Sequence, residues 1–251
     1  MKANKDGFHF SAFCLGIGCM ILLLQAGGAL HGNRIVFPDV REIGASFVRL
    51  LGQESTYASI GITLLHLLEA LAASMAAGIL LGLAEGLSSR FRSGLIPFTV
   101  LLRSLPMIVL VVLLMTVSSY DHVPVLAASL VLVPLISESV YEGVRSIDPE
   151  LKDVYRMNSS FSATVFFQVY LPLISGFLKQ AFFNAAGMGL KVVVSAEYLV
   201  QTRNSLGKEV YTSSYFLEYA EIYAYALIMI LLVLLVTEVP VRLLKRAGTR
   251  Y

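Results

Sequence analysis

Charged residues are scarce in this chain of 251 residues, and tryptophan is absent. Asp, Glu, Lys and Arg make up 14% of the sequence, against about a quarter in a typical soluble domain. Hydrophobic residues make up 57%, and the mean hydropathy is +0.75. A large soluble core does not explain so little charge, because the surface of a soluble protein must still face water. The composition therefore indicates an integral membrane protein.

Basic residues and cysteines are too few or too dispersed to indicate other classes of protein. The formal net charge is +2, which is too weak to favour nucleic acid as a partner. The two cysteines, Cys14 and Cys19, lie in the first apolar run and are expected to be small buried hydrophobic residues. Neither a disulfide framework nor a metal site is indicated.

Catalytic and nucleotide-binding motifs are also missing. The sequence has no GxxxxGK[ST] phosphate loop, no HExxH, no CxxC and no GxSxG nucleophile elbow. Its four histidines are scattered without the spacing of metal ligands. We therefore predict no catalytic residue, no metal and no cofactor bound by this chain, which cannot hydrolyse ATP by itself. Any uphill work must draw its energy from a partner or from an ion gradient.

Long uncharged stretches predict an all-α fold with six membrane-spanning helices. Each stretch is long enough, at about 1.5 Å per residue, to cross or nearly cross a hydrocarbon core about 30 Å thick. The predicted spans are Phe8–Leu30, Ala58–Ala84, Leu95–Val117, Val123–Tyr141, Leu173–Val200 and Tyr219–Val239. A cleavable signal peptide is the alternative for the first, but its apolar run is long and lacks an obvious small-x-small cleavage pattern. We expect one membrane domain over residues 1–251, with a core at about 58–240.

Lysine and arginine are biased toward one side of the predicted membrane. Of the nineteen, eleven fall in the segments that would lie inside, five in the outer segments and three within spans. Such an excess favours the cytoplasm for the richer side. Because six spans return the chain to the side where it began, we expect a multi-pass protein of the inner cell membrane with both termini in the cytoplasm.

Six charged residues fall inside the predicted spans, where an unpaired charge is costly. They are Glu69, Arg103, Glu138, Lys179, Lys191 and Glu197. Counting residues along straight helices places Glu69 and Arg103 at the same depth, about 18 Å from the outer edge. We predict that these two side chains form an ion pair; the alternative is that each reaches water or a backbone carbonyl separately. His66, three residues before Glu69, is expected to make a structural hydrogen bond with it in preference to a proton relay.

Three glycines on the second predicted span repeat a small-xxx-small spacing, Gly78, Gly82 and Gly86. In lipid this spacing lets two helix backbones approach closely. We favour packing within the chain over an interface between subunits.

The segment from Ser146 to Pro172 is long, predicted to be cytoplasmic, and charged in its first half. Its second half, Phe161–Val169, is apolar but interrupted by serine and glutamine. We predict two short helices at the membrane surface. Asp148-Pro149 predicts a cap followed by proline at the first helical position, and Leu171-Pro172 predicts the start of the next span.

Within this segment, Asp153-Val154-Tyr155 is followed by Ser159 and then by Val169-Tyr170-Leu171-Pro172. The pattern resembles the cytoplasmic loop of the permeases of binding-protein-dependent ABC importers, particularly the nitrate/sulfonate/taurine type. That loop reads EAAxxxG and ends on a hydrophobic-x-Leu-Pro. The approach to it, Gly143–Leu151, is similar to the family's lead-in GVRSVDPEL.

The resemblance extends over roughly residues 37 to 240. Four further stretches match in order: Phe37-Pro38, which could start a short helix in the outer connector, Leu102-Arg103-Ser104-Leu105-Pro106, Ser195-Ala196-Glu197 and Ser205-Leu206-Gly207. In this chain Val154-Tyr155 replaces Ala-Ala, and Ser159 replaces the glycine. Serine is less free than glycine to adopt positive φ. These departures imply a docking helix with altered partner specificity.

The resemblance implies a type I ABC importer permease that is driven by a separate ATPase. The implied ATPase-coupling residues are Glu150, Asp153, Val154, Tyr155, Ser159, Leu171 and Pro172. Candidates for the solute pathway or for intramembrane pairing are Glu69, Arg103, Pro106 and Glu197. The implied partners are ATP-binding cassette subunits that use the ATP, a second permease copy in a homodimer, an external substrate-binding protein and the lipid bilayer. The solute would be small and polar, either sulfonate-, nitrate- or taurine-like or vitamin-precursor-like.

Two other functions are compatible with the residues alone. An ion-coupled secondary carrier would use the charged residues within the spans, but it has no need of a cytoplasmic docking helix. A membrane scaffold without transport activity would need neither. An ATPase that co-purifies with the chain separates the importer from the carrier, and ATPase activity stimulated by a solute excludes the scaffold.

The predicted orientation can be tested by cysteine labelling in a background without Cys14 and Cys19. An impermeant thiol reagent added outside should label Ser55→Cys, which lies in a predicted outer segment, and spare Ser88→Cys. Labelling of Ser88→Cys and not Ser55→Cys would reverse the orientation.

Overall fold

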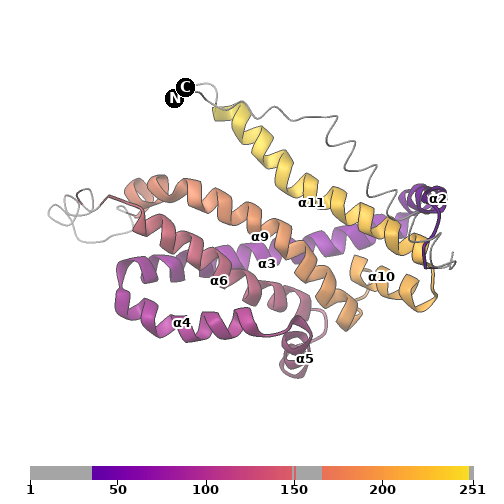
Figure 1. The fold of residues 1–251 in the computed structure, drawn as a ribbon, viewed down its shortest axis with the longest axis horizontal. Coiled ribbons are helices and arrows are strands. Elements are labelled where there is room, and N and C mark those ends of the chain that lie inside the picture. The colour runs from indigo at the N-terminus through magenta and orange to yellow at the C-terminus, as the bar shows by residue number, and fades with distance from the viewer. Residues whose placement is uncertain (1–35, 149, 151–165, 249–251) are drawn as a thin grey trace. The chain divides into compact units, whose positions relative to one another are not determined.

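The computed structural model describes residues 36–148, 150 and 166–248, and the elements found in these residues are all helices. They are α2 (Val40–Leu51), α3 (Glu54–Leu87), α4 (Ser89–Ser104), α5 (Met107–Val117), α6 (Val123–Arg145), the π-helix η1 (Phe166–Tyr170), α9 (Leu171–Val200), α10 (Leu206–Tyr215) and α11 (Tyr219–Gly248) (Figure 1). The predicted all-α fold is confirmed.

Three of the described helices are long and apolar enough to cross a membrane: α3, α6 and α11 over Tyr219–Thr237. They confirm the predicted spans 58–84, 123–141 and 219–239. α9 is 30 residues long and covers the predicted span 173–200, but it is more polar because it carries Lys179, Lys191 and Glu197. The first predicted span, Phe8–Leu30, lies outside the described residues.

The predicted span Leu95–Val117 is apolar enough to cross a membrane but is not one straight helix. The chain forms two helices there, α4 and α5, bent by 104° from one another. The cause is Pro106, which has no N–H to continue α4 and forces the residue before it out of the helical region. Leu105 is accordingly extended, with ψ 127°, and Pro106 follows with ψ 137°.

The described residues divide into two compact units, a larger one from within 55–209 and 229–248 and a smaller one from 36–54 and 210–228. In the smaller unit α2 begins at Val40, after the N-cap Asp39, so that Pro38 lies just before the helix. The carboxylate of Glu42 accepts the backbone N–H of Asp39 at 3.1 Å and thereby satisfies a donor at the helix start.

A partly exposed ion pair also lies within the smaller unit. Glu221 pairs with Arg49 and accepts a hydrogen bond from the Ser213 hydroxyl at 3.0 Å. A hydrogen bond with Glu221, together with the charge of that carboxylate, raises the pKa of Glu218 above its ordinary value, while Arg49 acts in the opposite direction.

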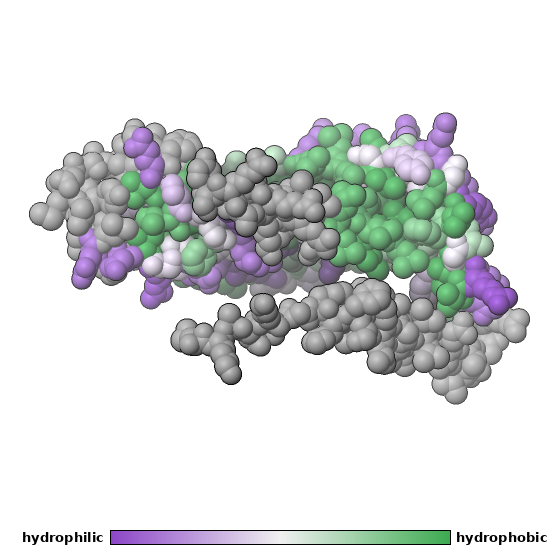
Figure 2. Space-filling view, turned by 90° about the horizontal axis from the view of Figure 1, so that it is seen from above, coloured by the Kyte–Doolittle hydropathy of each residue, from purple (hydrophilic) through white to green (hydrophobic). Residues whose placement is uncertain are grey.

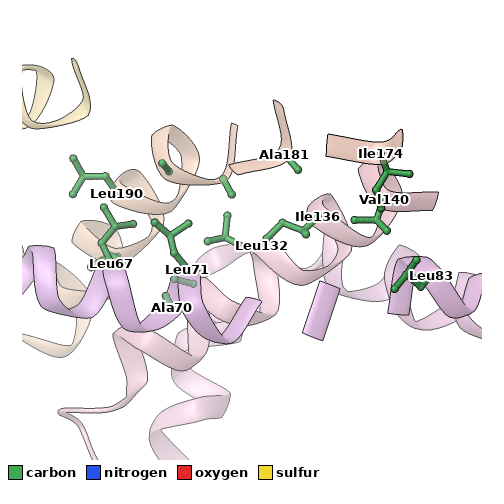
Figure 3. Close-up of a cluster of buried hydrophobic side chains, with 14 of the residues drawn as sticks. Leu67, Ala70, Leu71, Leu83, Leu132, Ile136, Val140, Ile174, Ala181 and Leu190 are labelled. Atoms are coloured by element: carbon green, nitrogen blue, oxygen red, sulfur yellow. The ribbon is translucent and has the colours of Figure 1, made fainter. Parts of the chain in front are cut away.

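In the larger unit, α3, α6 and α9 lie side by side around one hydrophobic core (Figure 1). Figure 3 shows leucine, isoleucine, valine and alanine side chains from all three helices pointing toward one another. Among them Leu67 on α3, Leu132 on α6 and Leu190 on α9 are at most 2% exposed. Burial of such side chains stabilises the unit by about 1.5–3 kcal/mol each as an upper estimate.

The three glycines of α3 are the points of closest approach to α6. A Cβ at Gly78, Gly82 or Gly86 would lie 2.5 to 2.7 Å from atoms of Ile136, Ser137, Val140 or Val144, which is too close for any side chain. The small-xxx-small pattern therefore serves packing within the chain, as predicted.

Large apolar side chains cover much of the outside. Figure 2 shows a broad hydrophobic area on the face that it presents, with hydrophilic residues at its margins. Phe98, Val117 and Leu80 are among the most exposed, at 67%, 78% and 69%. A soluble monomer rarely exposes such an area, whereas lipid accommodates it.

Replacing Gly82 tests this packing. Gly82→Ala should lower the stability of the purified protein by about 1–3 kcal/mol, because the new Cβ collides with the Ser137 carbonyl and with Val140. Gly61→Ala is the matched control on the same helix, since no atom lies within 4 Å of the Cβ it would add. Thermal unfolding in detergent measures both; equal melting temperatures for the two variants would contradict the assignment.

Candidate functional site: a charged cavity and its ion pairs

A cavity of about 710 Å³ opens where α4 meets α5, against α6 and α9. Its lining residues are Leu102, Arg103, Leu105, Met107, Val131, Leu135, Glu138, Ser139, Glu142, Met188, Lys191, Val192 and Ser195. The wall is mostly apolar, with two cations, two carboxylates and two hydroxyls. A largely apolar cavity with a few polar groups is the usual form of a small-molecule site.

Arg103 lies in the last turn of α4, just before the bend. Its guanidinium donates a hydrogen bond of 2.7 Å to the backbone carbonyl of Pro134 on α6. Glu69 lies exposed on α3, and within the described residues no ion pair joins it to Arg103. The predicted pair is therefore wrong for this chain, and the alternative of a backbone carbonyl holds for Arg103. The depth estimate assumed one straight span over 95–117, whereas α4, which carries Arg103, is bent by 104° from α5.

Arg92 at the start of α4 holds two carboxylates from two other helices. Its guanidinium lies 2.8 Å from Glu85 on α3 and 2.9 Å from Glu138 on α6, and it stacks 3.4 Å above the centre of the Tyr141 ring. Glu85 is only 4% exposed and accepts a further hydrogen bond from the Ser137 hydroxyl. The network ties α3, α4 and α6 together. It lies beside the cavity, because Glu138 is part of the network and also lines the cavity.

This network was missed from the sequence. Glu85 follows the last residue of the predicted span, and Arg92 was counted as an inner-loop residue. The feature of the sequence that could have indicated this network is Ser88, a residue type that favours the N-cap of a helix. Its hydroxyl accepts the Phe91 N–H at 3.3 Å and caps α4 directly after α3 ends. A turn this short brings the end of one helix next to the start of the other, and with them two opposite charges.

A second polar cluster surrounds Glu197 on α9, which is fully buried. Its carboxylate accepts the Thr63 hydroxyl at 2.9 Å and the Gly207 N–H at 3.2 Å, and lies 2.8 Å from Nδ1 of His66. The Thr63 hydroxyl in turn accepts the Leu206 N–H at 3.0 Å. The expected His66–Glu69 bond is therefore wrong, because His66 faces the core while Glu69 faces outward.

Glu197 occupies the N-terminus of α10, where the first N–H groups of a helix lack partners and favour negative charge. Gly207 permits this approach, since a Cβ there would lie 2.4 Å from Cβ of Glu197. The matched Ser-Ala-Glu and Ser-Leu-Gly stretches are thus parts of one joint between α3, α9 and α10.

The residues predicted to couple to an ATPase are only partly described. Glu150 donates its N–H to the Asp148 carboxylate at 3.0 Å, which fits the predicted cap at Asp148. Leu171 and Pro172 begin α9, as predicted. Asp153, Val154, Tyr155 and Ser159 lie outside the described residues. Pro106 stands at the bend, as the N-cap of α5.

Comparison with known proteins places these features in context. The sequence profile described as "Binding-protein-dependent transport system inner membrane component" matches residues 74–248, more than half of the chain. Among solved structures, a chain titled "Inward facing conformations of the MetNI methionine ABC transporter: CY5 native crystal form" is similar, with a TM-score of 0.63 and 15% identity. The similarity covers 76% of this chain and 93% of that one, and at this identity it shows the fold alone. Curated protein sequences gave no match.

Removing the charge of Arg92 tests the ion-pair network. Arg92→Gln should cost about 3 kcal/mol in the free energy of unfolding, because it leaves the Glu85 carboxylate buried without a cation. The double variant Arg92→Gln with Glu85→Gln should recover part of that loss. Glu138→Gln is the milder control, at about 1 kcal/mol or less, because its side chain is 36% exposed.

Chemical denaturation in detergent measures all three variants. An Arg92→Gln protein as stable as Glu138→Gln would contradict the network.

Proposed function

This chain belongs to the family of binding-protein-dependent transport system inner membrane components, and from that premise we propose how it works as an ABC importer permease. The observation that supports the proposal most is the extent of the match, which runs from within α3 through α11 and includes the segment 146–172. The chain imports a small polar solute, sulfonate-, nitrate- or taurine-like or vitamin-precursor-like, with energy from ATP that a separate subunit hydrolyses.

The segment 146–172 couples this permease to the ATPase. Asp153, Val154, Tyr155 and Ser159 dock on the ATPase, and Glu150 stands at the start of the docking helix. Leu171 and Pro172 pass the motion on, since they are the first residues of α9. α9 is a 30-residue helix packed on α6, so displacement of one end moves the residues that it brings to the cavity.

The cavity provides a route for the solute through the permease. Its polar groups sit on α4, α6 and α9; the Arg92 network holds α4 against α6, while α9 packs on α6. ATP binding closes the ATPase dimer, and the docking helix carries this motion into α9. The cavity then opens outward, where an external binding protein delivers the solute, and inward again after hydrolysis.

A second, identical copy of this chain completes the membrane part of the importer, which lies in the inner membrane with both termini in the cytoplasm. Family membership decides against the ion-coupled carrier and the scaffold as descriptions of this chain. Each of those alternatives would also leave the charged cytoplasmic segment without a role.

The coupling can be tested with the double variant Asp153→Lys and Ser159→Trp. Reversed charge and added bulk at the docking surface should abolish co-purification of the ATPase and stop uptake, while expression and membrane insertion stay normal. The matched control is Glu54→Lys with Ser55→Trp, which makes the same two changes in a predicted outer segment and should keep the ATPase. Normal uptake and normal co-purification in the first variant would refute the coupling role.

A further inference from the structure

The charges that line the cavity are separated by sign. Arg103 bonds to the carbonyl of Pro134, whereas the carboxylates of Glu138 and Glu142 come later on α6. With a rise of about 1.5 Å per residue they follow Pro134 by about 6 and 12 Å along the helix. The cation and the carboxylates therefore occupy different levels of the cavity.

Lys191 extends the cationic side. α6 and α9 run antiparallel, because Gly143 packs against Ile174 and Gly189 packs against Leu132. Lys191 comes after Gly189 on α9, so it lies on the side of Pro134 away from Glu142. Along the cavity the order is Lys191, Arg103, Glu138 and Glu142.

These groups have spare capacity to bind. Within the described residues, Lys191 and Glu142 have no side-chain hydrogen bond or ion pair, and Arg103 has the Pro134 carbonyl as its one partner. Glu138 bonds to Arg92 through one carboxylate oxygen and leaves the other available. Arg103, Lys191 and Glu138 fall within predicted spans, where an unpaired charge is costly, whereas Glu142 follows the last residue of the predicted span 123–141 and is exposed. A ligand of opposite charge would form charge-assisted hydrogen bonds with these groups.

We propose that this cavity binds zwitterionic solutes, with the acidic group of the solute at Arg103 and Lys191 and its ammonium group at Glu142 and the free oxygen of Glu138. A simple anion would pair with the cations but leave the carboxylates unpaired and repelled. A simple cation would pair with the carboxylates but leave Arg103 and Lys191 unpaired. The apolar wall, with Leu102, Leu135 and Met188, faces the carbon chain between the two groups.

This inference rests on the proposed function, in which the cavity is the solute route, and it narrows the solute class. It selects solutes that carry both charges over oxyanions such as nitrate.

The test measures binding to the purified full chain in lipid nanodiscs by calorimetry, with three probes of matched length. 5-Aminopentanoate carries both charges, 5-hydroxypentanoate carries only the negative charge, and 5-aminopentanol carries only the positive charge. We expect 5-aminopentanoate to bind at least about tenfold more tightly than either of the others. Equal affinity for the three probes, or no binding of 5-aminopentanoate at millimolar concentration, would overturn the proposal.

Two charge-neutralising variants test the assigned ends. Glu142→Gln should remove most of the preference of the cavity for 5-aminopentanoate over 5-hydroxypentanoate. Lys191→Gln should reduce the preference of the cavity for 5-aminopentanoate over 5-aminopentanol. Lys179→Gln is the control, since Lys179 lies on the same helix but not in the cavity lining, and it should bind like the unaltered chain. If Glu142→Gln and Lys191→Gln leave both preferences unchanged, the proposed ends are wrong.

The binding test needs neither the ATPase nor a binding protein. Its failure would therefore leave the coupling result at Asp153 and Ser159 intact. Conversely, failure of the coupling test with binding preserved would count against the ATP-driven mechanism alone.

Discussion

The close approach of α3 to α6 at Gly78, Gly82 and Gly86 is the contact on which the rest of the larger unit depends. It brings the end of α3 so near to α6 that the Ser137 hydroxyl reaches the Glu85 carboxylate. A carboxylate buried at that depth requires a cation, and Arg92 on the following helix supplies it. The position of α4, and hence of one wall of the cavity, follows from the close packing of α3 on α6.

The sequence predicted features that depend on composition and local spacing. Runs of apolar residues predicted α3, α6 and α11, and Leu171-Pro172 marked the first turn of α9, because these signals are read within a single helix. The glycine spacing predicted a close helix contact for the same reason. The charged residues were found as well, since any charge in an apolar stretch is conspicuous.

Partners across the fold could not be predicted, because they depend on how helices turn and bend. His66 was matched with Glu69 by sequence distance, yet the side of α3 that faces the core carries His66 toward Glu197, which lies 131 residues away. The depth of Arg103 assumes one straight span over 95–117, whereas α4 and α5 are separate helices and Arg103 bonds to the carbonyl of Pro134. The bend itself could have been predicted from Leu105-Pro106, because a proline disfavours the helical conformation at the residue before it.

The joint at Glu197 has a consequence for how the protein is made. Thr63 and His66 belong to an early helix, whereas Gly207, which completes the joint, is synthesised about 140 residues later. Until then a hydroxyl and an imidazole must rest in or beside the bilayer without their final partners, a situation that apolar surroundings penalise. α3 is therefore expected to stay beside the insertion machinery, or in contact with water, until α9 and α10 arrive. The buried carboxylate on α9 is then the group that gives Thr63 and His66 of α3 their final partner.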